Sequence, residues 1–139
     1  MPYAAQALTN RPSRPLTRRL NSGVRFPMKI VEKLMDGAAA DVDLLRSLDS
    51  QGDDFMKFRE VDFLILAPSE KDAHTICGFI NDFSFGVAST QISDGAHQVQ
   101  VMVQMPITQS VISCVSGFMA CVAHLYGGSL DGWGCVAQK

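Results

Sequence analysis

Two histidine–cysteine pairs carry the residue types that bind zinc. His74 and Cys77 are three positions apart, and Cys121 and His124 have the same spacing. Residues three apart share one face of a helix, so two packed helices would bring together a Cys2His2 ligand set. Cysteine is also a common small core residue and histidine is common near helix ends, which accounts for both pairs without a metal. We therefore expect no metal site and no cofactor.

Motifs for nucleophilic, metal-dependent and phosphate-binding enzymes are absent from the sequence. It contains no GxSxG, no HExxH and no P-loop, and its acids show no evident catalytic pairing. Gly127-Gly128 lacks the strand-before-helix context of a phosphate loop, and turn glycines explain it better. The sequence predicts a protein that is not an enzyme.

The stretch 125–134, Leu-Tyr-Gly-Gly-Ser-Leu-Asp-Gly-Trp-Gly, is the most distinctive in the chain. Trp133 is its only tryptophan and has a glycine on each side, which lets the backbone pack closely. Asp131 can bond its own backbone two residues on and shape the entry to a strand. The favoured interpretation is that the motif seats Trp133 against the core. Direct contact with a partner is the alternative, since tryptophan is also a typical interface anchor.

Length and composition indicate one domain. The chain has 139 residues, of which 47% are hydrophobic and 19% charged. A chain of this size buries roughly two-thirds of its unfolded surface and needs neither disulfides nor metal to fold. The four cysteines lie far apart with no CxxC pair, and no apolar signal segment follows the basic residues at the start. We expect reduced thiols and a cytoplasmic location.

The net charge of -2 conceals an uneven distribution. Residues 1–33 sum to +6 and residues 34–139 to -8. Residues 1–27 hold five arginines and no acid, which predicts a flexible basic arm before a single domain over 28–139. The arm is interpreted as a product of an upstream start codon, a transit peptide, or a contact for RNA or an acidic partner. The acidic domain itself is a poor candidate for nucleic acid.

Hydrophobic periodicity predicts the elements that position these residues. Ser69 followed by Asp72 resembles a capping box, which starts a helix, and Gly52 is typical of a helix end. Val99, Val101 and Val103 alternate with polar neighbours, which indicates a strand with one solvated side. The expected elements are helix 38–50, strand 61–67, helix 69–81, strand 83–91, strand 97–105, helix 107–126 and strand 131–138.

After Gly52 this order is that of two split βαβ units. It predicts an α+β ferredoxin-like sandwich, βαββαβ, in which a four-stranded antiparallel sheet carries two helices on one face. An extra N-terminal helix precedes it. Helix 107–126 is uncharged but interrupted by polar residues, so we reject a membrane span. Its serine-, glycine- and alanine-rich outer face is either a bland surface or suited to close packing against a helix of a second copy or a partner.

At the level of motifs the sequence resembles the family of regulators of ribonuclease E activity B, the RraB-like ribonuclease E inhibitors. The resemblance rests on Gly127-Gly128-Ser129-Leu130-Asp131-Gly132-Trp133-Gly134. It is supported by Leu45-x-x-Leu48 leading to Gly52-Asp53-Asp54, and by Arg59-Glu60-Val61-Asp62-Phe63 at the first strand. Together these motifs span about residues 36–138 in the family's order. Leu130 replaces the family's aromatic residue, and the acidic C-terminal tail of the best-known relative is absent from this sequence.

The resemblance implies a bacterial, cytoplasmic, non-enzymatic protein that binds the scaffold region of ribonuclease E and restrains RNA turnover. Its motif residues are candidates for partner contact, although they are equally candidates for structural roles. The candidates are Asp53, Asp54, Arg59, Asp131, Gly132 and Trp133. The alternative function is a ferredoxin-like domain that self-associates through helix 107–126 as a homo-oligomer and binds a small molecule or another regulator. Nucleic-acid binding is expected only through the basic arm.

Overall fold

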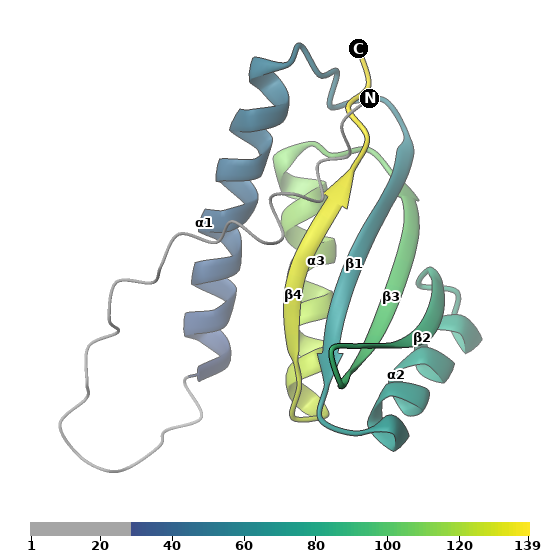
Figure 1. Ribbon diagram of the computed structural model, residues 1–139. Helices are drawn as coiled ribbons and strands as arrows, with labels where there is room; N and C mark the ends of the chain where they lie inside the picture. Colours follow the sequence, from purple (N-terminus) through teal and green to yellow (C-terminus); the bar gives the residue numbers. More distant parts are fainter. Residues whose placement is uncertain (1–28) are drawn as a thin grey trace, which may run out of the picture.

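The computed structural model describes residues 29–139 (Figure 1). The predicted basic arm, residues 1–27, lies outside the described residues. The elements in chain order are α1 Lys29–Ser50, β1 Arg59–Ala67, α2 Glu70–Asp82, β2 Val87–Ser93, β3 Ala96–Met105, α3 Gln109–Leu125 and β4 Ser129–Cys135.

The strands form one antiparallel sheet in the order β2-β3-β1-β4. Each helix that follows a strand returns the chain to a parallel strand two positions away. Consequently β3 lies between β1 and β2, and β1 lies between β3 and β4. This is the interlocked arrangement of two split βαβ units, and it confirms the predicted ferredoxin-like sandwich with an extra leading helix.

The core lies between the sheet and α2 and α3. Val61, Phe63 and Ile65 of β1 are fully buried, as are Val99 and Val101 of β3. These residues alternate with half-buried or exposed positions, as expected for a sheet with one covered face. Figure 1 shows α2 and α3 on the same side of the sheet, with α1 alongside α3.

Helix α1 and strand β2 begin at residues other than those predicted. Helix α1 begins at Lys29 rather than near residue 38. The prediction began too late because glycine is a poor helix former, and Gly37 therefore interrupts the helical pattern in the sequence. Strand β2 begins at Val87 rather than Phe83. Residues 83–86 form a turn in which Ser84 has φ 58°, a conformation that no strand residue adopts.

The predicted start of α2 is confirmed in detail. Ser69 is extended, and its hydroxyl accepts a hydrogen bond from the backbone N–H of Asp72. One of the free N–H groups of the first turn is thereby satisfied. No helix in residues 29–139 is both long and apolar enough to cross a bilayer.

Candidate functional site

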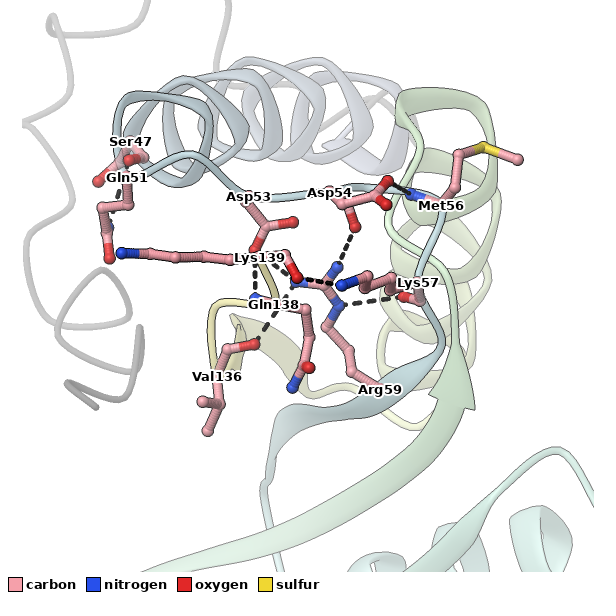
Figure 2. A network of polar contacts seen from close by, with 10 residues as sticks. All are labelled: Ser47, Gln51, Asp53, Asp54, Met56, Lys57, Arg59, Val136, Gln138 and Lys139. Carbon is pink, nitrogen blue, oxygen red and sulfur yellow. Dashed lines mark hydrogen bonds and ion pairs between the residues drawn. The ribbon is translucent and has the colours of Figure 1, made fainter.

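A buried ion pair joins Asp53, in the connection between α1 and β1, to Arg59, the first residue of β1. Nη1 of Arg59 lies 2.5 Å from Oδ2 of Asp53, and the two side chains are 1% and 0% exposed. Nη2 of Arg59 donates to the carbonyl of Asp54 at 2.7 Å, and Nε donates to the carbonyl of Lys57 at 3.3 Å (Figure 2). The planar guanidinium therefore holds the connecting loop along its length.

The same network holds the segment that follows β4. The backbone N–H of Gln138 donates to Oδ2 of Asp53 at 2.9 Å. The N–H of Asp54 in turn donates to the carbonyl of Gln138 at 2.6 Å. The ammonium group of Lys57 donates to the carbonyl of Lys139. These bonds replace sheet pairing for the last residues, and this is why β4 ends earlier than predicted.

The loop that this network fixes presents two large apolar side chains to solvent. Met56 is 70% exposed and Phe58 is 72% exposed, and Figure 2 shows Met56 pointing away from the polar network. Phe55 packs against the core. Its backbone carbonyl accepts a hydrogen bond from the N–H of Ile107 at 2.9 Å. Exposed apolar side chains on an ordered loop are a common feature of protein-binding surfaces.

Trp133 belongs to a second, separate network. Its ring is 2% exposed, and Nε1 donates to Oδ1 of Asp41 on α1 at 2.8 Å. The hydroxyl of Ser116 on α3 donates to the same oxygen at 3.4 Å. Asp41 and Ser116 are each 4% exposed. The tryptophan thus links β4 to both α1 and α3 from inside the fold, as the favoured interpretation of the motif holds.

Sequence reasoning missed Asp41. The residue lies on the apolar stripe of α1 formed by Leu44, Leu45 and Leu48, all of them buried. An acid at a core-facing helix position is uncommon unless it has a partner. That position was the available signal, but it does not reveal that Trp133 is the partner.

The glycines of the motif have separate steric reasons. Gly127 has φ 74°, which suits glycine at the end of a helix. A Cβ added at Gly128 would overlap the carbonyl oxygen of Leu66. In β4 the pairing with β1 changes register, so that Leu64 pairs with Gly132 and Ile65 with Leu130. Asp131 is therefore the extra residue of a β-bulge.

The predicted site residues therefore divide between two networks. Asp53, Asp54 and Arg59 lie together in the loop network. Trp133 lies in the network of Asp41, and Asp131 and Gly132 shape the bulge beside it. Because Asp53, Arg59 and Trp133 are buried, their positions favour the structural role over direct contact, and partner contact by these residues stays a prediction.

Asp62 on β1 is a half-buried carboxylate on the sheet face that carries no core residues. Its Oδ1 atom is buried and has no hydrogen-bond partner. Burial raises the pKa of this carboxyl above its ordinary value, and hydrogen bonding from Gln100 offsets part of the effect. The ionised side chain therefore destabilises the fold, and no interaction within the described chain fully compensates it.

We expect Asp62→Asn to remove a pH dependence of stability. With a raised pKa the folded chain binds the proton more tightly than the unfolded chain does. Stability therefore falls as pH rises from the unfolded-state pKa through the folded-state pKa. At neutral pH the variant should be at least as stable as the wild type, and the difference should shrink on acidification. Urea unfolding between about pH 4 and pH 7 measures this, and a variant less stable at neutral pH would contradict it.

The outer face of α3 packs partly against α1 of the same chain. A Cβ added at Gly117 would lie 3.6 Å from the side chain of Leu34, and Ser116 contacts Asp41. Between the two helices lies a cavity of about 420 Å³, lined mainly by small residues. The small residues of α3 thus have an intramolecular neighbour and do not require a second copy.

The histidine–cysteine pairs do not converge. In residues 29–139 no three His, Cys, Asp or Glu side chains lie close enough to hold a metal ion. His74 Nε2 lies 3.5 Å from Glu70 on its own helix, and Cys77 donates to the carbonyl of Ala88. All four cysteines are free thiols. Burial raises the pKa of the Cys135 thiol, which keeps it in its unreactive, protonated form.

Comparison with known families identifies a match over most of the described chain. Residues 38–135 match the family model described as regulator of ribonuclease activity B, RraB. The matched range contains the ion pair of Asp53 and Arg59 as well as the hydrogen bond between Asp41 and Trp133. A comparison with curated proteins finds no match.

Proposed function

The chain belongs to the family of regulator of ribonuclease activity B, and we propose that it binds the scaffold region of ribonuclease E and thereby modulates RNA turnover. It acts by occupying a regulatory segment of the nuclease and performs no chemistry itself. The family membership supports regulation of a ribonuclease, and the choice of the scaffold region as target follows the resemblance given above.

The observation that carries the proposal is the position of the motif residues. The Asp53 and Arg59 side chains are buried and bond to each other and to backbone groups of the same chain, so they shape a surface. The surface that they shape is the loop with exposed Met56 and Phe58. Residues on such a loop lose little conformational entropy on binding, because the loop is already ordered.

We expect the double substitution Met56→Ser, Phe58→Ser to weaken binding of the ribonuclease E scaffold region at least about tenfold. Both side chains are exposed, so the fold should survive, which thermal unfolding checks. Isothermal titration of the full chain with the purified scaffold region measures the affinity. Ile92→Ser removes a comparably exposed apolar side chain from β2, 67% exposed, and should leave the affinity unchanged. Equal binding by the double variant and the wild type would exclude the loop as the contact.

Binding to the scaffold region is itself tested by the wild-type titration. A wild-type chain that does not bind this region would contradict the proposed partner. Inhibition of RNA cleavage by ribonuclease E, measured with and without the chain, tests the regulatory consequence separately.

A further inference from the structure

One face of the sheet is left uncovered by α1, α2 and α3 (Figure 1). The pairing registers place six central side chains on this face, referred to below as the open face: Asp62, Leu64, Leu66, Gln98, Gln100 and Met102. All six are half-buried, whereas their neighbours on the other face form the core. An uncovered sheet face of this kind can receive a partner segment.

Around Asp62, the open face carries glycines, apolar side chains and neutral glutamines. Gly134 is paired with Asp62, and Gly132 with Leu64, so the β4 residues paired with these two positions place no side chain beside them. Leu64 and Met102 provide apolar surface beside the carboxylate. Gln98 and Gln100 are neutral, and Gln98 is already bonded to Gln91 at 2.8 Å.

Charges on this face have one sign. Within β1 and β3, the ionisable side chains on this face are Asp62 and, nearer the start of β1, Glu60; neither strand places a lysine, arginine or histidine there. Asp62 also keeps one oxygen buried and without a hydrogen-bond donor. A cationic donor that arrives at this face would compensate the carboxylate and gain a charge-assisted hydrogen bond. A nucleic acid would be repelled.

We propose that the open face is a docking surface for an arginine-bearing segment of a protein partner, with one guanidinium bound to the carboxylate of Asp62. The aliphatic part of that arginine lies over Leu64 and Met102, and the planar head bonds the carboxylate. Rotation about the last side-chain torsion of Asp62, which is soft, turns the buried oxygen toward the donor. The proposal rests on the proposed function, since it names the chemistry by which a protein target is recognised.

The test uses the full chain and a short polyarginine peptide as the probe, titrated by calorimetry at physiological ionic strength. A citrulline peptide of the same length keeps the shape and removes the charge. Asp62→Asn should weaken polyarginine binding about tenfold to a hundredfold, the range for one lost charge-assisted bond. Glu70→Gln, which removes an exposed acid from α2 on the other side of the sheet, should change it by less than about twofold. Backbone amide shifts should move most on β1 and β3.

Several results would overturn the proposal. These are equal binding by Asp62→Asn and the wild type, equal binding of the citrulline peptide, or competition by an RNA oligonucleotide for the same amide shifts. Amide shifts on β1 and β3 that follow protein concentration, with a dimer in light scattering, would identify a second copy as the occupant and also overturn it.

Titration of the same variants with the ribonuclease E scaffold region separates the two proposals. If the wild type binds that region and Asp62→Asn binds it equally well, the proposal that the open face is the docking surface is wrong and the proposed function stands. If the wild type fails to bind it but shows the Asp62-dependent affinity for polyarginine, the partner is wrong and the docking surface stands.

Discussion

Replacing Arg59 with methionine should lower the free energy of unfolding by about 3–5 kcal/mol, the range for removing one partner of a buried ion pair. The reason is that Asp53, with a side chain that is 0% exposed, keeps its charge in the interior without a counter-ion. The carbonyls of Asp54 and Lys57 lose their donor in the same step. Urea unfolding monitored by circular dichroism measures the change.

A second arginine–aspartate pair supplies the control. Arg46 and Asp43 on α1 are 3.8 Å apart, with side chains 78% and 63% exposed. Arg46→Met should therefore change stability by less than about 1 kcal/mol, because exposed pairs contribute little. The double variant Asp53→Asn, Arg59→Met should lose less stability than the two single variants added together. Additive losses, or equal effects at Arg59 and Arg46, would show that burial of the pair does not matter.

The sequence predicted the order of the elements because periodicity is a local property. Val99, Val101 and Val103 alternate with polar neighbours, and this pattern identifies a strand whatever it pairs with. The capping of α2 by Ser69 is equally local. Two split βαβ units have few ways to close into one sheet, so the ferredoxin-like topology followed from the order alone.

The position of α1 could not be predicted in the same way. It depends on small residues of α3, including Gly117, that allow Leu34 of α1 to approach closely. Such residues are equally compatible with a bare surface, an oligomer or an intramolecular neighbour. The sequence does not distinguish these three arrangements, because no local pattern specifies which helix packs against α3.

The site was only partly predictable for a related reason. Asp53, Asp54 and Arg59 were identified as a motif, but their partners are backbone groups of Gln138 and neighbouring residues. Every residue has such groups, so they leave no trace in the sequence. Met56 and Phe58 were missed because an apolar residue in a loop is buried or exposed according to how that loop is held.

Trp133→Ala should be as damaging as the loss of Arg59, with an expected loss of about 3–5 kcal/mol for an aromatic side chain removed from a core. The ring is 2% exposed and lies opposite Phe63 in the pairing of β4 with β1, so its removal leaves a cavity beside the sheet. Chemical unfolding monitored by far-UV circular dichroism measures the loss, since the only tryptophan would be gone.

Trp133→Phe separates the packing of the ring from its hydrogen bond. Phenylalanine retains most of the apolar volume but lacks the Nε1–H group that donates to Asp41 at 2.8 Å. A hydrogen bond to a charged group contributes about 1.5–3 kcal/mol, so the stability of the phenylalanine variant should lie between that of the wild type and that of the alanine variant.

Asp41→Asn retains an acceptor oxygen and should reduce the additional effect of Trp133→Phe on stability in a double-mutant cycle. If the phenylalanine variant were as stable as the wild type, the hydrogen bond would be dispensable and packing alone would explain why the motif carries a tryptophan. If the cycle shows coupling, the bond from Trp133 to Asp41 contributes to holding α1 against the sheet.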